Sequence, residues 1–277
     1  RLPVIAEMLA KAACDETQGP LADFWLDETG WETLRTAAWL HDCGKVTTPE
    51  YVIDKGVKLE TLYNRIHEIR MRFEVLKRDA EIACWKAIAQ GADRRTEEAQ
   101  CKARHQQLLA DYLFIAECNI GGEVMSDEAI TRLNEIAEQR WLRTLPDDVG
   151  LSEDERLRKG PTLRLPVEEK LLADKPEHRI ARPVSQVIPE DNPWGFRVEV
   201  PTYLYDHGEL HNLSIRRGTI NDEERYKINE HIIQTVLMLE KLPFPDPLKR
   251  VPEIAVNHHE RVDGKGYPRR LTGKQMS

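Results

Sequence analysis

Two short stretches of the sequence place a histidine directly beside a second metal-ligating group. His41 and Asp42 end one apolar helical pattern, and His258 and His259 end another near the carboxyl end of the sequence. Imidazole and carboxylate groups bind hard or borderline divalent cations, and one carboxylate can bridge two ions. A lone His-Asp pair is common by chance, and a His-His pair also occurs as a surface cluster. Because both pairs follow apolar helices, together they predict a metal site.

Composition and net charge indicate the class of protein and limit the kinds of molecule that it can bind. The 277 residues carry a formal net charge of −8, with 40% hydrophobic residues and 32% charged residues of both signs. This composition is typical of a folded, helix-rich protein rather than a disordered or fibrous one. The acidic balance leaves no basic face that could follow a phosphate backbone, so we expect no nucleic-acid polymer as a partner. A small anionic substrate is compatible with this charge because bound metal ions reverse the local sign of a site.

The cysteines and the apolar runs indicate a compartment. The five cysteines have no CxxC spacing, which fits reduced cytosolic thiols better than a disulfide framework. No apolar run approaches the roughly 18 to 20 residues that span a bilayer. We therefore expect a cytoplasmic chain, on its own or as the cytoplasmic part of a membrane-anchored sensor. Both ends of the sequence interrupt a pattern, so we also expect a piece of a longer protein.

Helices are predicted to carry the ligand pairs at both ends of the chain. Apolar spacing in residues 1–58 predicts helices over about 4–14 and 31–41. Acidic residues suited to a helix N-terminus begin a further helix at Asp222, and prolines stop it after Leu242. A last short helix leads into the second histidine pair. These patterns predict a mostly α fold.

The middle of the chain, residues 59–145, has a different pattern. From Leu59 to Ala87, apolar residues alternate steps of three and four, a heptad seam of about four repeats. Two more helices are predicted over about 96–116 and 126–141. The simplest arrangement is an antiparallel, coiled-coil-like helical arm. We interpret the arm as a spacer and packing surface, with a homodimer or protein-partner interface as the alternative.

Residues 146–212 are rich in proline, which excludes long helices. The stretch 196–200 alternates apolar and polar residues and predicts a short edge strand. We expect the whole segment to be an irregular, extended return path from the arm to the rest of the chain.

The two histidine motifs together resemble those of the HD-GYP family. Residues 41–45 read HDCGK and resemble the HDxGK signature of HD-type metal phosphohydrolases. Residues 258–268 read HHERVDGKGYP and resemble the HHExxDGxGYP signature that names the HD-GYP group. The resemblance covers roughly residues 1–58 and 210–277. It implies an HD-type helical bundle whose two parts, 1–58 and 213–277, are separated by the arm and the return segment.

The family's internal spacing selects one further histidine. Minimal HD-GYP domains carry a stretch like KPGKLTxEE, with a histidine ligand a fixed distance after its leucine. Counting that distance from Ile220 reaches His231, whereas counting from Leu59 reaches Arg70, which cannot be a ligand. His67 is expected on a solvated flank of the arm. The count therefore favours His231 as a ligand.

The resemblance also implies a metal centre. It implies two or three divalent ions, iron or manganese in character, with Asp42 bridging them and a water between them attacking phosphorus. The implied ligands are His41, Asp42, His231, His258 and His259. In the family, further ligands lie upstream of the position of Arg1 and downstream of the position of Ser277.

The implied substrate is cyclic-di-GMP, hydrolysed to pGpG and in part to GMP in bacterial second-messenger signalling. Lys45 would act in catalysis by offsetting charge on the phosphoryl oxygens and would also bind substrate. The other implied substrate contacts are Arg261, Lys265 and Tyr267. Two alternatives stay open: an HD hydrolase acting on another nucleotide, and a degenerate HD-GYP module that binds a partner without turnover.

Overall fold

The computed structural model describes residues 1–122 and 124–276, and it is mainly helical. Helices hold 53% of the chain and strands 7%, which confirms the mostly α fold. Among the described residues, no helix is both long and apolar enough to cross a membrane. Glu123 and Ser277, which the predicted spans of the arm and of the second HD-GYP part include, lie outside the described residues.

The described chain forms two compact units, which we call the histidine unit and the arm unit. The histidine unit comprises Arg1–Ile53, Pro183–Pro201 and Arg225–Ser277. The arm unit comprises Asp54–Arg182 and Thr202–Glu224. The four-part division predicted from the sequence stays a prediction.

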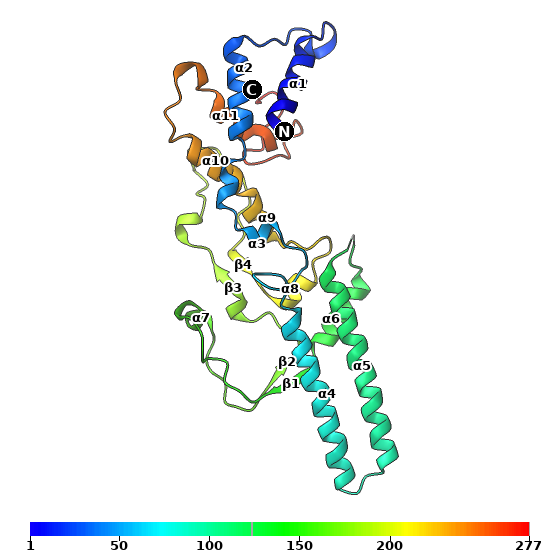
Figure 1. Ribbon diagram of the computed structural model, residues 1–277. Helices are drawn as coiled ribbons and strands as arrows, with labels where there is room; N and C mark the ends of the chain where they lie inside the picture. Colours follow the sequence, from blue (N-terminus) through cyan, green and yellow to red (C-terminus); the bar gives the residue numbers. More distant parts are fainter. Residues whose placement is uncertain (123, 277) are drawn as a thin grey trace. The chain divides into compact units, whose positions relative to one another are not determined.

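The helices of the histidine unit pack around a small apolar core (Figure 1). Helix α2 (Glu28–Leu40) begins where the Asp27 carboxylate accepts a hydrogen bond from the Gly30 amide at 2.7 Å. The unit also contains α1 (Leu2–Cys14), α3 (Glu50–Ile53), α10 (His231–Leu239) and α11 (Val251–Val256). The buried core side chains are Ala37, Leu239, Val251 and Ala255. This packing brings the ends of α2 and α11 to α10.

The predicted helix from Asp222 to Leu242 is divided into two. Helix α9 (Asp222–Asn229) ends before Glu230, and α10 begins at His231. The candidate ligand His231 therefore stands on the first turn of a buried helix rather than in the middle of a longer one. The side chain of His231 is 3% exposed.

The arm unit is built on an antiparallel pair of long helices (Figure 1). Helix α4 (Ile66–Ala89) and helix α5 (Arg94–Ile120) lie side by side and are joined by a short turn. Asp93 caps α5, since its carboxylate accepts a hydrogen bond from the Thr96 amide at 2.9 Å. The shared core buries Ile69, Phe73, Leu76, Leu108 and Ile115. The predicted hairpin is present.

The predicted start of the first arm helix was wrong. The chain is not helical from Leu59 to Arg65, and Leu62 is 86% exposed although it occupies a heptad position. The Asn64 side chain accepts a hydrogen bond from the Ile66 amide at 3.1 Å, a local turn that starts the helix at Ile66. Leu59 is buried all the same, because it packs in the core from outside the helix.

A third helix and a short hairpin sheet complete this part of the arm unit. Ser126 caps α6 (Asp127–Ala137) by accepting a hydrogen bond from the Ala129 amide, close to the predicted start of this helix. The helix stops earlier than predicted. Trp141, expected at its end, lies in strand β1 (Arg140–Arg143), which pairs antiparallel with β2 (Val167–Lys170).

The proline-rich segment holds short elements instead of one extended path. Besides β2, they include α7 (Glu153–Arg158), β3 (Arg179–Ala181), β4 (Tyr203–Asp206) and α8 (Glu209–Leu213), and β3 pairs antiparallel with β4. The strand predicted over 196–200 was wrong, since this stretch belongs to no strand. Phe196 is buried there in an apolar cluster of the histidine unit, which explains the alternation without a sheet.

Two buried lysines bind the start of the arm unit, near residue 55, to its end, near residues 213–224. Lys55 lies 2.8 Å from both carboxylate oxygens of Glu224, and the two side chains are only 2% and 3% exposed. Lys58 donates hydrogen bonds to the carbonyls of Leu213 at 2.9 Å and Ile215 at 2.7 Å. The chain therefore returns to the place from which it left.

Candidate metal centre

The turn after α2 carries Asp42 and is packed tightly on α10. The Gly44 amide donates a hydrogen bond to the Thr235 hydroxyl at 3.0 Å, and that hydroxyl donates to the His231 carbonyl at 2.9 Å. A Cβ atom at position 44 would lie 1.9 Å from the same carbonyl. Glycine is therefore required here, because only a residue without a side chain lets the Asp42 turn approach His231 so closely.

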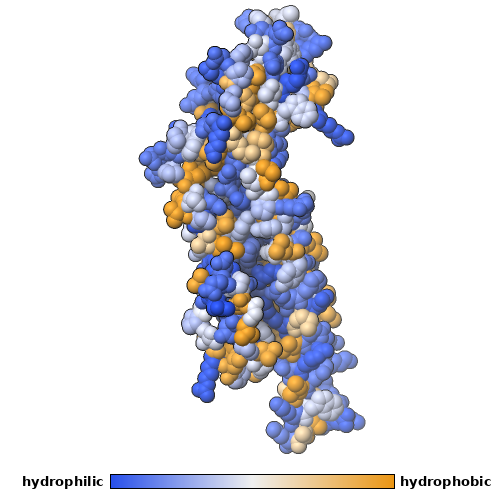
Figure 2. Space-filling model, turned by 60° about the vertical axis from the view of Figure 1, so that its left-hand side comes forward, coloured by the Kyte–Doolittle hydropathy of each residue, from blue (hydrophilic) through white to orange (hydrophobic). Residues whose placement is uncertain are grey.

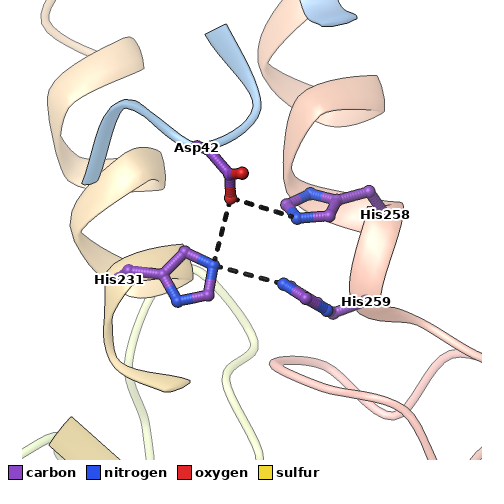
Figure 3. A group of neighbouring side chains, drawn as sticks. All are labelled: Asp42, His231, His258 and His259. Carbon is purple, nitrogen blue, oxygen red and sulfur yellow. Dashed lines mark hydrogen bonds and ion pairs between the residues drawn. The ribbon is translucent and has the colours of Figure 1, made fainter. Parts of the chain in front are cut away.

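Four side chains from three parts of the chain converge on one point (Figure 3). Asp42 Oδ1 lies 3.5 Å from His231 Nε2 and 3.7 Å from His258 Nε2, and the Nε2 atoms of His231 and His259 are 3.2 Å apart. One ligand atom from each of Asp42, His231, His258 and His259 lies within 4.8 Å of all the others. This spacing is small enough for the four groups to share a metal ion.

The backbone fixes which ring nitrogen of each histidine faces the cluster. His231 Nδ1 lies 2.6 Å from the Ile228 carbonyl, and His258 Nδ1 lies 2.6 Å from the Ala255 carbonyl. A carbonyl only accepts hydrogen bonds, so each Nδ1 must carry the proton. The Nε2 of each neutral ring then presents its lone pair to the centre, which is the orientation of a metal ligand.

Electrostatics also favour a cation at this point. Burial raises the pKa of Asp42, but the hydrogen bond from Lys45 and the nearby rings of His41 and His258 outweigh it and lower the pKa overall. Burial, followed by repulsion from His258 and His231, lowers the pKa of His259 to about 4. The His259 ring therefore stays neutral at neutral pH beside the ionised carboxylate of Asp42. Asp42 Oδ1 is buried and accepts no hydrogen bond from any described residue.

Two more predicted site residues surround the second oxygen of Asp42. His41 Nε2 lies 2.9 Å and Lys45 Nζ 2.7 Å from Asp42 Oδ2. His41 also meets the His258 ring edge to face, at 4.8 Å between centroids. The structure thus places His41 next to the group of four, and Lys45 at its more exposed side, with 56% of the side chain accessible.

Comparison with known proteins gives one match. Residues 166–277 match the HD domain family. The match supports assignment to the HD superfamily. HD domains bind divalent metals and are generally metal-dependent phosphohydrolases. No curated protein and no solved structure matches the chain.

The segment that matches the HD domain family includes His231, His258 and His259 but does not include the Asp42 turn. The turn precedes the arm in the chain, whereas the other three ligands follow it. Only the folded arrangement brings Asp42 into the same group as the histidines of the matched segment.

A buried glutamate organises the loop that follows the histidine pair at residues 258 and 259. Glu260 is 8% exposed, and its two oxygens accept hydrogen bonds from the amides of Arg269 at 2.6 Å and Leu271 at 2.8 Å. A Cβ atom on Gly266 would lie 2.4 Å from the Glu260 Cα. Our sequence interpretation gave Glu260 no role, although the HHE motif contains it. The structure shows that it closes the loop and is not among the four clustered ligands.

The closed loop sets Tyr267 against the metal centre. Its ring stacks on that of His259, with centroids 4.6 Å apart and planes at 14°. The other two predicted substrate contacts, Arg261 and Lys265, are exposed on the same loop, and Arg261 lies 3.6 Å from Asp263. The structure therefore brings Tyr267 to the cluster but leaves the two cations at the surface.

The choice between His231 and His67 has a structural counterpart. His231 lies in the cluster, whereas His67 is exposed on α4 in the arm unit. The histidine that the family spacing favoured, His231, is thus the one that the structure places beside Asp42.

Proposed function

We propose that this chain carries the catalytic site of a metal-dependent phosphodiesterase of the HD-GYP type, which hydrolyses cyclic-di-GMP to pGpG and in part to GMP in the bacterial cytoplasm. The observation that carries the proposal is the sequence HHERVDGKGYP at residues 258–268. Its first two residues are members of the candidate metal centre, and its GYP segment stacks on that centre through Tyr267.

The residues present fit the divalent ions that the HD family implies. His41, Asp42, His231, His258 and His259 would hold two or three ions, with iron or manganese our choice because imidazole and carboxylate ligands suit both. Bound ions supply positive charge for the phosphoryl oxygens and lower the pKa of a water molecule. The orphaned Oδ1 of Asp42 and the inward Nε2 atoms of the histidines support this ligand set.

Residues of the chain itself would hold and orient the substrate. Lys45 Nζ lies 2.7 Å from Asp42, and its exposed side chain can turn to a phosphoryl oxygen and offset the charge that develops there. Arg261 and Lys265 follow the histidine pair on the surface loop and supply cations for the second phosphate of a cyclic dinucleotide. Tyr267 offers an aromatic surface next to the ligand ring of His259.

Parallel metal analysis and product chromatography test the proposal. We expect the purified protein to bind iron or manganese and to convert cyclic-di-GMP to pGpG. Asp42→Ala and His231→Ala should each reduce the bound metal and lower turnover by at least about a hundredfold. His67→Ala is the matched control, since His67 is exposed on the arm, and it should retain both.

Three results would count against the proposal. A metal-loaded protein that hydrolyses other nucleotides but leaves cyclic-di-GMP intact would indicate a different HD hydrolase. Tight binding of cyclic-di-GMP without product would indicate a non-catalytic module. If both Asp42→Ala and His231→Ala retained the metal, the metal would not be bound at the candidate centre.

A further inference from the structure

The two long helices of the arm unit leave a groove open on one face. It has a volume of about 480 Å³, and apolar side chains are exposed in it, with Trp85 54% and Leu109 53% accessible. In Figure 2 the narrow lower end, which is the tip of this helix pair, carries apolar side chains among polar ones. We call this hollow the arm groove, and its charged and large polar lining includes Lys77, Glu81, Glu98, Lys102 and Gln106.

The lining residues occur at matching heights on the two helices. Because α4 and α5 run antiparallel from the turn at residues 90–93, residues equally distant from that turn lie at the same level. Lys77 is then level with Gln106, Glu81 with Lys102, and Trp85 with Glu98. The hydrogen bond of 3.0 Å between His105 and the Lys77 carbonyl agrees with this alignment. At 1.5 Å per residue, neighbouring levels are about 6 Å apart.

This order of charges is complementary to itself. A two-fold axis parallel to the helices would lay α4 of one copy antiparallel to α5 of a second copy, with equal levels facing each other. Glu81 would then face Lys102 of the partner subunit, and Lys102 would face Glu81 of the partner subunit. Lys77 would face Gln106 of the partner subunit, and Trp85 would face Glu98 of the partner subunit, so no facing pair joins like charges. The opposite charges of Glu81 and Lys102 thus meet twice, as an isologous interface requires.

We propose that the arm groove is a dimer interface whose occupant is the arm groove of a second copy of this chain, forming a four-helix arrangement. The four charges of the groove, Lys77, Glu81, Glu98 and Lys102, sum to zero, so the groove does not select a strongly acidic or basic partner. The exposed Trp85 supplies the apolar anchor of the interface. This interface is independent of the chemistry at the metal centre.

Charge reversal measured by analytical ultracentrifugation tests the proposal. We expect the parent chain to be a dimer, and Glu81→Lys or Lys102→Glu alone to raise the dimer dissociation constant about tenfold or more by setting like charges opposite each other twice. Asp79→Lys and Lys86→Glu are matched controls with the same changes of charge. Both are exposed on the opposite side of α4 and should leave the dissociation constant unchanged.

Mixing the two variants separates an interface from an effect inside one chain. Glu81 and Lys102 share a level within each arm, and Glu81 also lies 3.7 Å from His105, so either variant alone could disturb its own helix pair. In a mixture of Glu81→Lys with Lys102→Glu, both contacts between positions 81 and 102 of different copies again join opposite charges, whereas the contact between these positions within each copy stays repulsive. Recovery of a mixed dimer supports the proposal.

Two outcomes would overturn the proposal. One is a parent chain that stays monomeric at every concentration, which would leave the groove to another protein. The other is a dimer whose dissociation constant the two groove variants and the two controls change equally.

Discussion

The ring of Tyr267 lies flat on the ring of His259, with 4.6 Å between centroids and 14° between planes. His259 Nε2 faces His231 Nε2 at 3.2 Å, so the tyrosine supports one of the four clustered ligands from behind. Glu260, next in the chain, accepts hydrogen bonds from the amides of Arg269 and Leu271 and thereby closes the loop that carries Tyr267. The GYP part of the motif is thus physically coupled to its histidines.

Removing the aromatic ring at position 267 should weaken metal binding. In Tyr267→Leu the His259 ring loses its stacking partner and gains rotational freedom, so we expect about a tenfold loss of Mn²⁺ affinity. Tyr267→Phe keeps the ring and should bind Mn²⁺ like the parent. Isothermal titration with Mn²⁺ measures both, and equal affinities in the leucine and phenylalanine variants would contradict a positioning role for the ring.

A methyl group at position 44 should damage the fold around the Asp42 turn. The Cβ of Gly44→Ala would fall 1.9 Å from the His231 carbonyl, so the turn or α10 must move. We expect a loss of about 2–4 kcal/mol in the free energy of unfolding, with weaker metal binding. Urea denaturation measures the change. Gly160→Ala is the control, because a Cβ there meets nothing within 4 Å, and a similar loss in both variants would refute the steric explanation.

The sequence identified most of the candidate metal centre because its clustered side chains occur in short local motifs. His41, Asp42, His258 and His259 are adjacent pairs at helix ends, and the family spacing added His231. Glu260 was missed because its partners are backbone amides, which leave no mark on side-chain types. Thr235 was missed for a related reason, since its hydroxyl accepts a hydrogen bond from the amide of Gly44, which lies 191 positions away in the sequence.

Breaking the buried ion pair of the arm unit should be costly. Glu224→Gln leaves the Lys55 ammonium, 2% exposed, without a negative partner, and we expect a loss of about 3–5 kcal/mol in stability. The double variant Lys55→Met with Glu224→Leu removes both charges and should recover most of that loss. Urea titrations compare them with Glu74→Gln, which breaks an exposed pair on α4 and should leave the midpoint unchanged. If the double variant were no more stable than Glu224→Gln, the unpaired charge of Lys55 would not explain the loss of stability.

The stability of the arm unit should fall as the pH drops below about 6.5. Burial, then repulsion from Arg65, Lys55 and His178, lowers the pKa of His207 from 6.5 to about 4. As the pH falls, His207 therefore takes up a proton in the unfolded chain before it does so in the folded one. The contribution of its neutral ring to the free energy of unfolding is complete above pH 6.5 and is lost as the pH falls towards 4.

Thermal denaturation of His207→Phe across this range tests the assignment. The phenyl ring preserves the stacking of His207 on Tyr205, whose ring centroid is 5.7 Å away, but cannot take up a proton. Relative to the variant, the parent should lose about 1–3 kcal/mol between pH 6.5 and pH 4, after allowance for partial exposure. Parallel pH profiles for the two proteins would exclude His207 as the titrating group.

The fold was predictable where one apolar face decided the structure. The helices α2, α4 and α5 follow from their periodicity, because burying one face of a helix leaves a clear trace in the sequence. The start of α4 did not follow from it, since Leu59 is buried from outside the helix and the Asn64 turn sets the boundary. Trp141 was assigned to a helix because the partner of its strand, Val167–Lys170, lies too far along the chain to be recognised from local pattern.

Lys58 binds carbonyls that lie 155 and 157 positions further along the chain. The segment between Lys58 and these carbonyls is therefore a loop with its two ends in contact. The entropic cost of closing such a loop rises by only about 0.6 kcal/mol for each doubling of its length. Whole helical turns can therefore be gained or lost at the far end of the arm without displacing either anchor. Insertions or deletions of whole turns at the arm tip are therefore changes that this anchor tolerates, so the length of the arm can differ between related sequences while its two ends keep their contact.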